Sequence, residues 1–175
     1  MKLIQLFESQ FPTSREEVEA ICKKYKIQNY TINDDLSIDV DGDVDLHYRF
    51  LDFLPIKFGT VSGDFGCSGN QLTSLKGAPR EVGGSFDCGD NKLISLKGAP
   101  REIGGSFSCS VNMLSSLEGS PKLVGGDFYC EYNHLTSLEG APREVGKDFY
   151  CNDNPYLKSL EGIGNVRGSI ISDLE

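Results

Sequence analysis

Five cysteines recur at a fixed interval and are the first residues that could carry chemistry. Each lies 21 residues after the one before, at Cys67, Cys88, Cys109, Cys130 and Cys151. Neighbouring strands of a sheet lie about 4.8 Å apart, so stacked cysteines could approach bonding distance. Five residues in one column cannot pair evenly, however, and the spacing lacks the close pairs of a zinc site. We therefore predict reduced, buried thiols that pack as small apolar side chains.

Other catalytic groupings are lacking in the sequence. The two histidines are His47 and His134, and no Ser-His-Asp or Cys-His arrangement can be built around them. His134 takes a repeat position that holds Gln71, Lys92 and Met113 in earlier copies, which is typical of a surface residue. No glycine-rich loop precedes a helix to hold phosphate. We expect no enzymatic activity and no cofactor.

Four alternating aspartates raise the possibility of a calcium site. They are Asp39, Asp41, Asp43 and Asp45. A helix-loop-helix calcium loop needs a glycine after its third ligand and an acidic residue at its end, where this chain has Val44 and Phe50. The alternation with apolar residues favours a strand with one solvated face, and we predict no metal site.

The cysteines belong to a longer repeated phrase, Phe-x-Cys-x-x-Asn, which occurs five times. A fixed period of this size marks a stacked repeat. Phe86 and Cys88 alternate on a short strand and should both point inward. Asn91 ends the strand, where its amide can bond backbone groups of the turn and tie one coil to the next. Pro100 makes a helical return segment unfavourable.

The phrase resembles the leucine-rich repeat, Leu-x-x-Leu-x-Leu-x-x-Asn-x-Leu, with Phe86 and Cys88 in the second and third leucine places. The similarity covers about residues 44–174. The short return with proline resembles the repeats of bacterial effector proteins. The phrases Asn-x-Leu-Thr-Ser-Leu-x-Gly-Ala-Pro and Ile38 to Leu46 are similar to those of small, uncharacterised leucine-rich repeat proteins of tailed bacteriophages. The resemblance implies a parallel-sheet solenoid that binds a protein, with a host protein as candidate partner and interference with host physiology or defence as candidate role.

Residues 1–43 are predicted to form an N-terminal cap of two short helices and the first strand of a hairpin. The first helix spans 1–11. The second starts at a capping box of Ser14 and Glu17 and has an apolar face that includes Val18 and Cys22. The hairpin is predicted to turn over 41–43, so that Val40 pairs with Val44 and Ile38 with Leu46.

Residues 44–175 are predicted to form a solenoid of seven coils of about 21 residues, with a parallel sheet and short non-helical returns. The first and last coils diverge from the consensus, as expected for terminal repeats. The predicted strands start at Val44, Phe65, Phe86, Phe107, Phe128, Phe149 and Ile170.

The charge of the chain limits its partners. The formal net charge is -9, whereas binding to a nucleic-acid backbone or an anionic membrane needs clustered basic residues. No stretch reaches the roughly 20 apolar residues of a membrane span, and the N-terminus is a poor signal peptide. We predict a cytoplasmic protein whose partner is a basic protein rather than nucleic acid or membrane.

Outward positions of the repeat vary, and in the last two full coils they become aromatic and acidic. Tyrosine among acids on an exposed sheet is typical of a binding site for a basic, partly apolar surface. Two alternatives stay open: the tyrosines only shield the sheet, or the acids, including Asp39 to Asp45, imitate nucleic acid in the basic groove of another enzyme. The predicted partner-binding residues are Asp127, Tyr129, Glu131, Tyr132, His134, Asp148, Tyr150 and Asp153.

Overall fold

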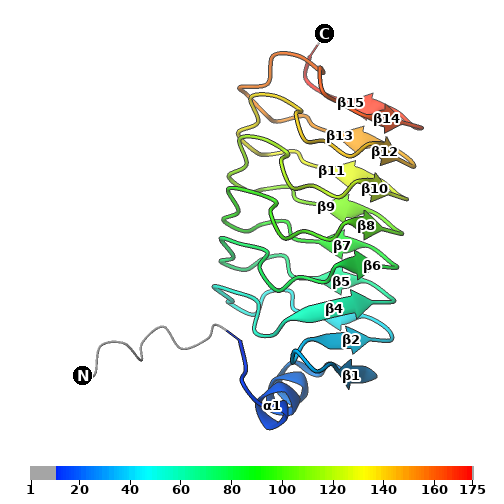
Figure 1. Cartoon of the computed structure of the whole chain (residues 1–175). Coiled ribbons are helices and arrows are strands. Elements are labelled where there is room, and N and C mark those ends of the chain that lie inside the picture. Colours follow the sequence, from blue (N-terminus) through cyan, green and yellow to red (C-terminus); the bar gives the residue numbers. More distant parts are fainter. Residues whose placement is uncertain (1–10, 175) are drawn as a thin grey trace.

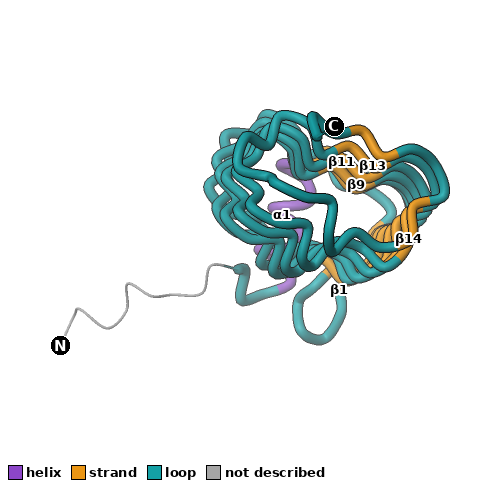
Figure 2. Tube along the Cα trace, turned by 90° about the horizontal axis from the view of Figure 1, so that it is seen from above, coloured by secondary structure: helices purple, strands orange, loops and turns teal. Residues whose placement is uncertain are grey.

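The computed structural model describes residues 11–174, which form a parallel β-solenoid (Figure 1). Successive coils lie above one another, as the view along the stack shows (Figure 2). Each coil contributes one strand to each of two sheets, and the rest of its path is turns and bends. This confirms the predicted repeat solenoid with short non-helical returns. The predicted helix 1–11 lies outside the described residues, apart from Phe11.

The seven-stranded sheet, here called sheet B, carries the Phe-x-Cys phrase. Its strands start at the seven predicted residues and pair in parallel register, so that Phe86 lies between Phe65 and Phe107. The five phenylalanine rings are stacked inside the coil, with centroids 4.9 to 5.6 Å apart. The strands of sheet B are β3 (Val44–Asp45), β5 (Phe65–Gly66), β7 (Phe86–Asp87), β9 (Phe107–Ser108), β11 (Phe128–Tyr129), β13 (Phe149–Tyr150) and β15 (Ile170–Ile171).

The eight-stranded sheet, here called sheet A, was not predicted. Its first strand pairs antiparallel with the second, and the others follow in parallel. Within β6, β8, β10 and β12 one residue is buried and the residue before it is exposed, as with Val82 and Glu81. The strands are β1 (Tyr30–Ile32), β2 (Ile38–Val40), β4 (Phe58–Val61), β6 (Glu81–Val82), β8 (Glu102–Ile103), β10 (Leu123–Val124), β12 (Glu144–Val145) and β14 (Asn165–Val166).

The hairpin predicted for 38–46 is wrong. β2 pairs with β1 and β4 in sheet A, whereas β3 pairs with β5 in sheet B. The segment between them is the corner at which each coil passes from one sheet to the other. Alternation of apolar and polar residues occurs on both sides of the corner because both strands have one buried face. The first coil of the stack therefore already includes β2.

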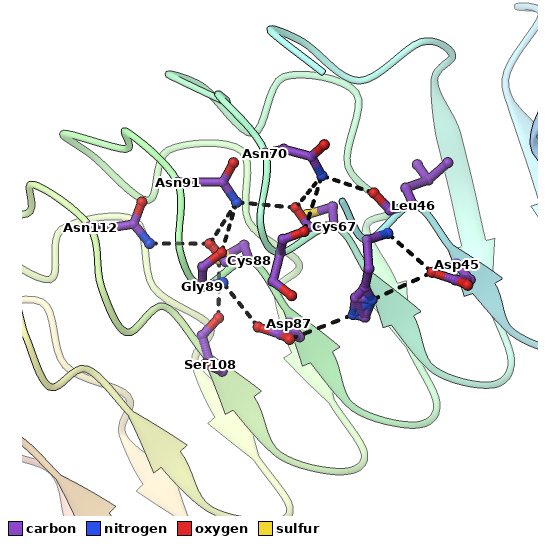
Figure 3. Close-up of polar contacts among 12 residues, drawn as sticks. Asp45, Leu46, Cys67, Asn70, Asp87, Cys88, Gly89, Asn91, Ser108 and Asn112 are labelled. Carbon is purple, nitrogen blue, oxygen red and sulfur yellow. Dashed lines mark hydrogen bonds and ion pairs between the residues drawn. The ribbon is translucent and has the colours of Figure 1, made fainter. Parts of the chain in front are cut away.

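The asparagine column joins successive coils. Asn112 donates its Nδ2 protons to the carbonyls of Cys88, 3.1 Å away in the preceding coil, and of Cys109, 3.0 Å away in its own. Its Oδ1 accepts the N–H of Leu93 at 2.9 Å. The same pattern repeats through the stack (Figure 3), and it confirms the predicted role of the asparagines.

The cysteine column lies in the core, as predicted. All five thiols are buried and free. Burial raises the pKa of Cys151 to about 11 and raises that of the four others further. Three of the sulfurs lie 3.2 to 3.4 Å from a carbonyl oxygen of the following coil, where the S–H can donate a weak hydrogen bond.

Helix α1 (Arg15–Tyr25) caps the N-terminal end of the stack (Figure 1). Ser14 is its N-cap and accepts the N–H of Glu17 at 3.2 Å, as predicted. The Glu17 carboxylate accepts from the N–H of Thr13, one residue before the cap, rather than from Ser14 itself. Val18 and Cys22 are buried in the core that continues into the coils. In the described part of the chain, no helix has the length and apolarity that crossing a membrane requires.

The asparagine column generates a stability prediction. Asn112→Ala leaves the backbone N–H of Leu93 without its partner, whereas the carbonyls of Cys88 and Cys109 keep the amides of Asn91 and Asn133. A buried backbone group without a partner costs about 1 to 3 kcal/mol, so we expect a loss of about 1 to 3 kcal/mol in the free energy of unfolding.

Urea unfolding followed by circular dichroism measures this loss. Asn152→Ala is the matched control, because its amide contacts only the exposed Asp153 side chain, and its effect should stay within about 0.5 kcal/mol. Equal effects of the two substitutions would show that the column does not hold the coils together.

Candidate functional site

Two tyrosines form a flat aromatic surface on sheet B. Tyr129 on β11 and Tyr150 on β13 are register partners, and both side chains point away from the core. Their rings are therefore stacked, with centroids 4.7 Å apart and planes inclined by 17°. Both residues are half-buried. Burial is the main cause that raises the pKa of both phenols. The second cause is a neighbouring carboxylate, which is Asp127 for Tyr129 and Asp148 for Tyr150.

Tyr132 extends this surface beyond the end of the strand. It has φ 54°, in the left-handed region, as do Asp90, Val111 and Asp153 at the same repeat position. This conformation turns the chain and leaves the Tyr132 side chain 58% exposed. The charge of Asp153, and then a hydrogen bond to it, raises the pKa of the Tyr132 phenol. Tyr129, Tyr132 and Tyr150 are together called the tyrosine patch below.

His134 lies at the return side of the same coils. Its ring faces that of Tyr156, with centroids 6.1 Å apart and planes inclined by 36°. Tyr156 is 56% exposed. The structure thus adds Tyr156 to the exposed aromatic residues of the last coils.

The predicted acidic residues have structural partners as well. Asp127 Oδ1 accepts the N–H of Asp148 at 3.0 Å, and Asp148 Oδ1 accepts the N–H of Ser169 at 2.7 Å. These bonds belong to a corner ladder that runs from Asp43 through Asp64, Ser85 and Ser106 to Asp148, each side chain accepting from the next coil. Comparison of the repeats within the sequence did not reveal this ladder, because the position alternates between aspartate and serine. Both side chains can accept a hydrogen bond there.

The second oxygen of each of these carboxylates also lies near a hydroxyl group. Asp148 Oδ2 accepts from the Tyr150 hydroxyl at 3.4 Å, and Asp127 Oδ2 lies 3.4 Å from the Ser106 hydroxyl. Glu131 accepts the Ser110 hydroxyl at 2.7 Å. Hydrogen bonds therefore position the acids around the tyrosines before any partner arrives.

The opposite end of sheet B carries a different arrangement. His47 lies between Asp45 and Asp87, with Nδ1 3.5 Å from the first carboxylate and Nε2 3.6 Å from the second. Gly66 makes this possible, because a Cβ there would overlap the imidazole. Gly69 likewise leaves room for the ring of Tyr48. The small residues of the early coils thus accommodate side chains that lie across the sheet.

The four alternating aspartates are separated by the first corner. Asp39 accepts from the Thr60 N–H, Asp41 from the Ser62 hydroxyl and Asp43 from the Asp64 N–H. Asp45 accepts the His47 N–H at 3.1 Å. Among residues 11–174, no group of three or more acidic, histidine or cysteine side chains is placed to hold a metal ion.

A second surface, which the sequence reading missed, lies along sheet A. A groove of about 850 Å³ extends from the segment around Asn29 to Arg167, across the strands β2 to β12. Its floor includes Val82, Ile103 and Val124, whose side chains are buried. Its sides carry the exposed glutamates and the corner glycines of successive coils. The apolar residue that recurs at Val61, Val82 and Ile103 could have revealed this sheet.

Comparison of the chain with protein-family models, curated proteins and solved structures found no match. The candidate sites are therefore interpreted from their own geometry.

The contact between Tyr132 and Asp153 generates a pH prediction. A negative charge beside a phenol disfavours the phenolate, and Asp153→Asn removes that charge. We expect the pKa of Tyr132 to fall toward the ordinary tyrosine value of about 10. NMR titration with carbon-labelled tyrosine measures it residue by residue. Asp90→Asn, at the same repeat position two coils away, should leave the Tyr132 titration unchanged; an unchanged titration in Asp153→Asn would contradict the assignment.

Proposed function

We propose that the chain is a non-enzymatic binding module that holds a basic, partly apolar protein surface against the tyrosine patch. The observation that supports this most directly is the stacked pair Tyr129 and Tyr150, surrounded by carboxylates on an exposed sheet. The likeness to leucine-rich repeats, which work by binding, points in the same direction.

The patch is suited to binding because its side chains are already ordered. In-register pairing of β11 and β13 and stacking of the two rings fix both tyrosines before association. Binding then costs less side-chain entropy than it would with mobile residues. Tyrosine also combines a large apolar face with a hydroxyl, which is why it is frequent at binding hot spots.

The charge around the patch favours a cationic partner. Asp127, Glu131, Asp148 and Asp153 surround the three tyrosines, and the chain as a whole carries a net charge of -9. Lysine and arginine side chains can pair with these carboxylates, and their charged groups can also lie over the tyrosine rings. Complementary charge increases the association rate and excludes acidic partners.

Imitation of nucleic acid is the alternative function. The specific observation in its favour is that several carboxylates recur at coil spacing on both sheets. A mimic would compete with DNA for its partner, and its binding would weaken strongly with salt. Binding through the tyrosine patch buries aromatic surface and should tolerate salt better. A competition experiment across ionic strengths therefore separates the two functions.

Replacement of Tyr129 and Tyr150 by serine tests the proposal. Hot-spot tyrosines contribute about 2 kcal/mol each, so the double variant should lose retention of any partner that the unmodified chain captures from bacterial lysate. Because both rings are only half-buried, the melting temperature should fall by no more than about 5 °C.

The matched control replaces Tyr48 and Phe50 by serine, two exposed aromatic residues at the other end of the stack. Quantitative mass spectrometry of the captured proteins should show a partner retained by this control and lost from the tyrosine variant. A captured set that is the same for both variants would exclude the patch as the binding site.

A further inference from the structure

The groove along sheet A has the form of a binding channel that crosses the coils. It follows the stack axis and passes over successive strands from β2 to β12. Neighbouring strands lie about 4.8 Å apart, so a groove across these six strands is about 24 Å long. An extended peptide advances about 3.3 Å per residue and would occupy this length with about seven residues.

The glycines of the corner keep one side of the groove free of side chains. A Cβ on Gly104 would lie within 2.0 Å of the Gly83 carbonyl oxygen, and Gly83, Gly125 and Gly146 face similar contacts with the preceding coil. Close stacking of the backbone therefore requires glycine at these positions. The glycines therefore leave this side of the groove without side chains in the middle coils.

The other side of the groove carries glutamates that the stack does not need. Glu81 and Glu102 are register partners, and neither side-chain carboxylate makes a hydrogen bond or an ion pair with a described residue. Like charges in adjacent register positions destabilise a sheet. Thr60, Leu123 and Asn165 take the same position in other coils, so no structural rule calls for an acid.

The total charge of the groove is strongly negative. Its lining includes the carboxylates of Asp39, Asp41, Glu81, Glu102 and Glu144, against the single guanidinium of Arg167, which lies 3.7 Å from Glu144. Asp39 and Asp41 accept hydrogen bonds from the next coil, which leaves Glu81 and Glu102 free to bind. Backbone and apolar atoms form most of the remaining surface.

We propose that this groove binds an extended, basic segment of a partner protein, with arginine or lysine directed at Glu81, Glu102 and Glu144. An extended chain fits the length, its apolar residues can lie on the floor, and long cationic side chains can reach carboxylates one or two coils apart. This surface is separate from the tyrosine patch and does not depend on the function proposed for it.

Fluorescence anisotropy with a labelled peptide of about ten residues, alternating arginine and valine, tests the proposal. The unmodified chain should bind this peptide and not its counterpart with glutamate in place of arginine. The triple variant E81Q/E102Q/E144Q should weaken binding about tenfold. Leu123→Glu adds an acid to the column and should tighten binding about threefold, whereas Leu123→Lys should weaken it.

The triple variant E118Q/E139Q/E161Q is the matched control, because it changes the net charge equally at exposed positions away from the groove. It should bind the peptide as the unmodified chain does. An equal loss in both triple variants would show attraction to net charge alone and overturn the proposal, as would absence of binding to the unmodified chain.

The variant with serine at Tyr129 and Tyr150 should bind the peptide unchanged. Loss of binding in this variant would place the peptide on the tyrosine patch instead of in the groove. The two proposals can therefore fail separately.

Discussion

The side-chain amide of asparagine is the interaction on which the stack depends. Where a strand of sheet B ends, the chain turns, and some of its carbonyl and N–H groups lose their backbone partners in the neighbouring coils. One asparagine per coil replaces those partners in its own coil and in the coil before it, as Asn112 does for Cys88 and Leu93. This geometry works only if every coil has the same length up to the next asparagine. The last coil has one additional residue between its asparagine and the next leucine. This residue follows Asn154, which is the last member of the asparagine column in the described residues.

Much of the fold could be predicted because the 21-residue repeat is visible whatever the secondary-structure propensity of each short segment. The recurring phrase located five strands of sheet B and the step of 21 residues located the other two, although each strand is too short for a propensity argument. The first corner was predicted wrongly because that prediction used a local pattern instead of the repeat. From Ile38 to Leu46 the apolar residues alternate as in a hairpin, and alternation alone does not say whether two strands pair with each other or lie in different sheets. The step of 21 residues from Val40 to Val61 indicates that these two residues pair in a separate sheet.

The tyrosines of the candidate site could be found in the sequence, but the roles of the acids around them could not. Comparison by residue type treated the position before each phenylalanine as variable. In the structure this position has a constant task, acceptance of a backbone N–H from the next coil, which Ser106 and Asp127 perform equally well. The groove was missed because one of its sides consists of glycines such as Gly104, whose effect on shape depends on how closely the coils approach.

The asparagine bonds have a direction. The Asn91 amide reaches back to Cys67 and Leu72, residues that a ribosome synthesises earlier. A newly made coil therefore finds its docking groups on a coil that is already complete, and α1 with β1 and β2 offers the first surface. Growth by addition of coils keeps each new contact about one repeat apart in sequence, so folding can propagate from each coil to its neighbour. The architecture is thus suited to vectorial assembly during translation, from the capped end outward.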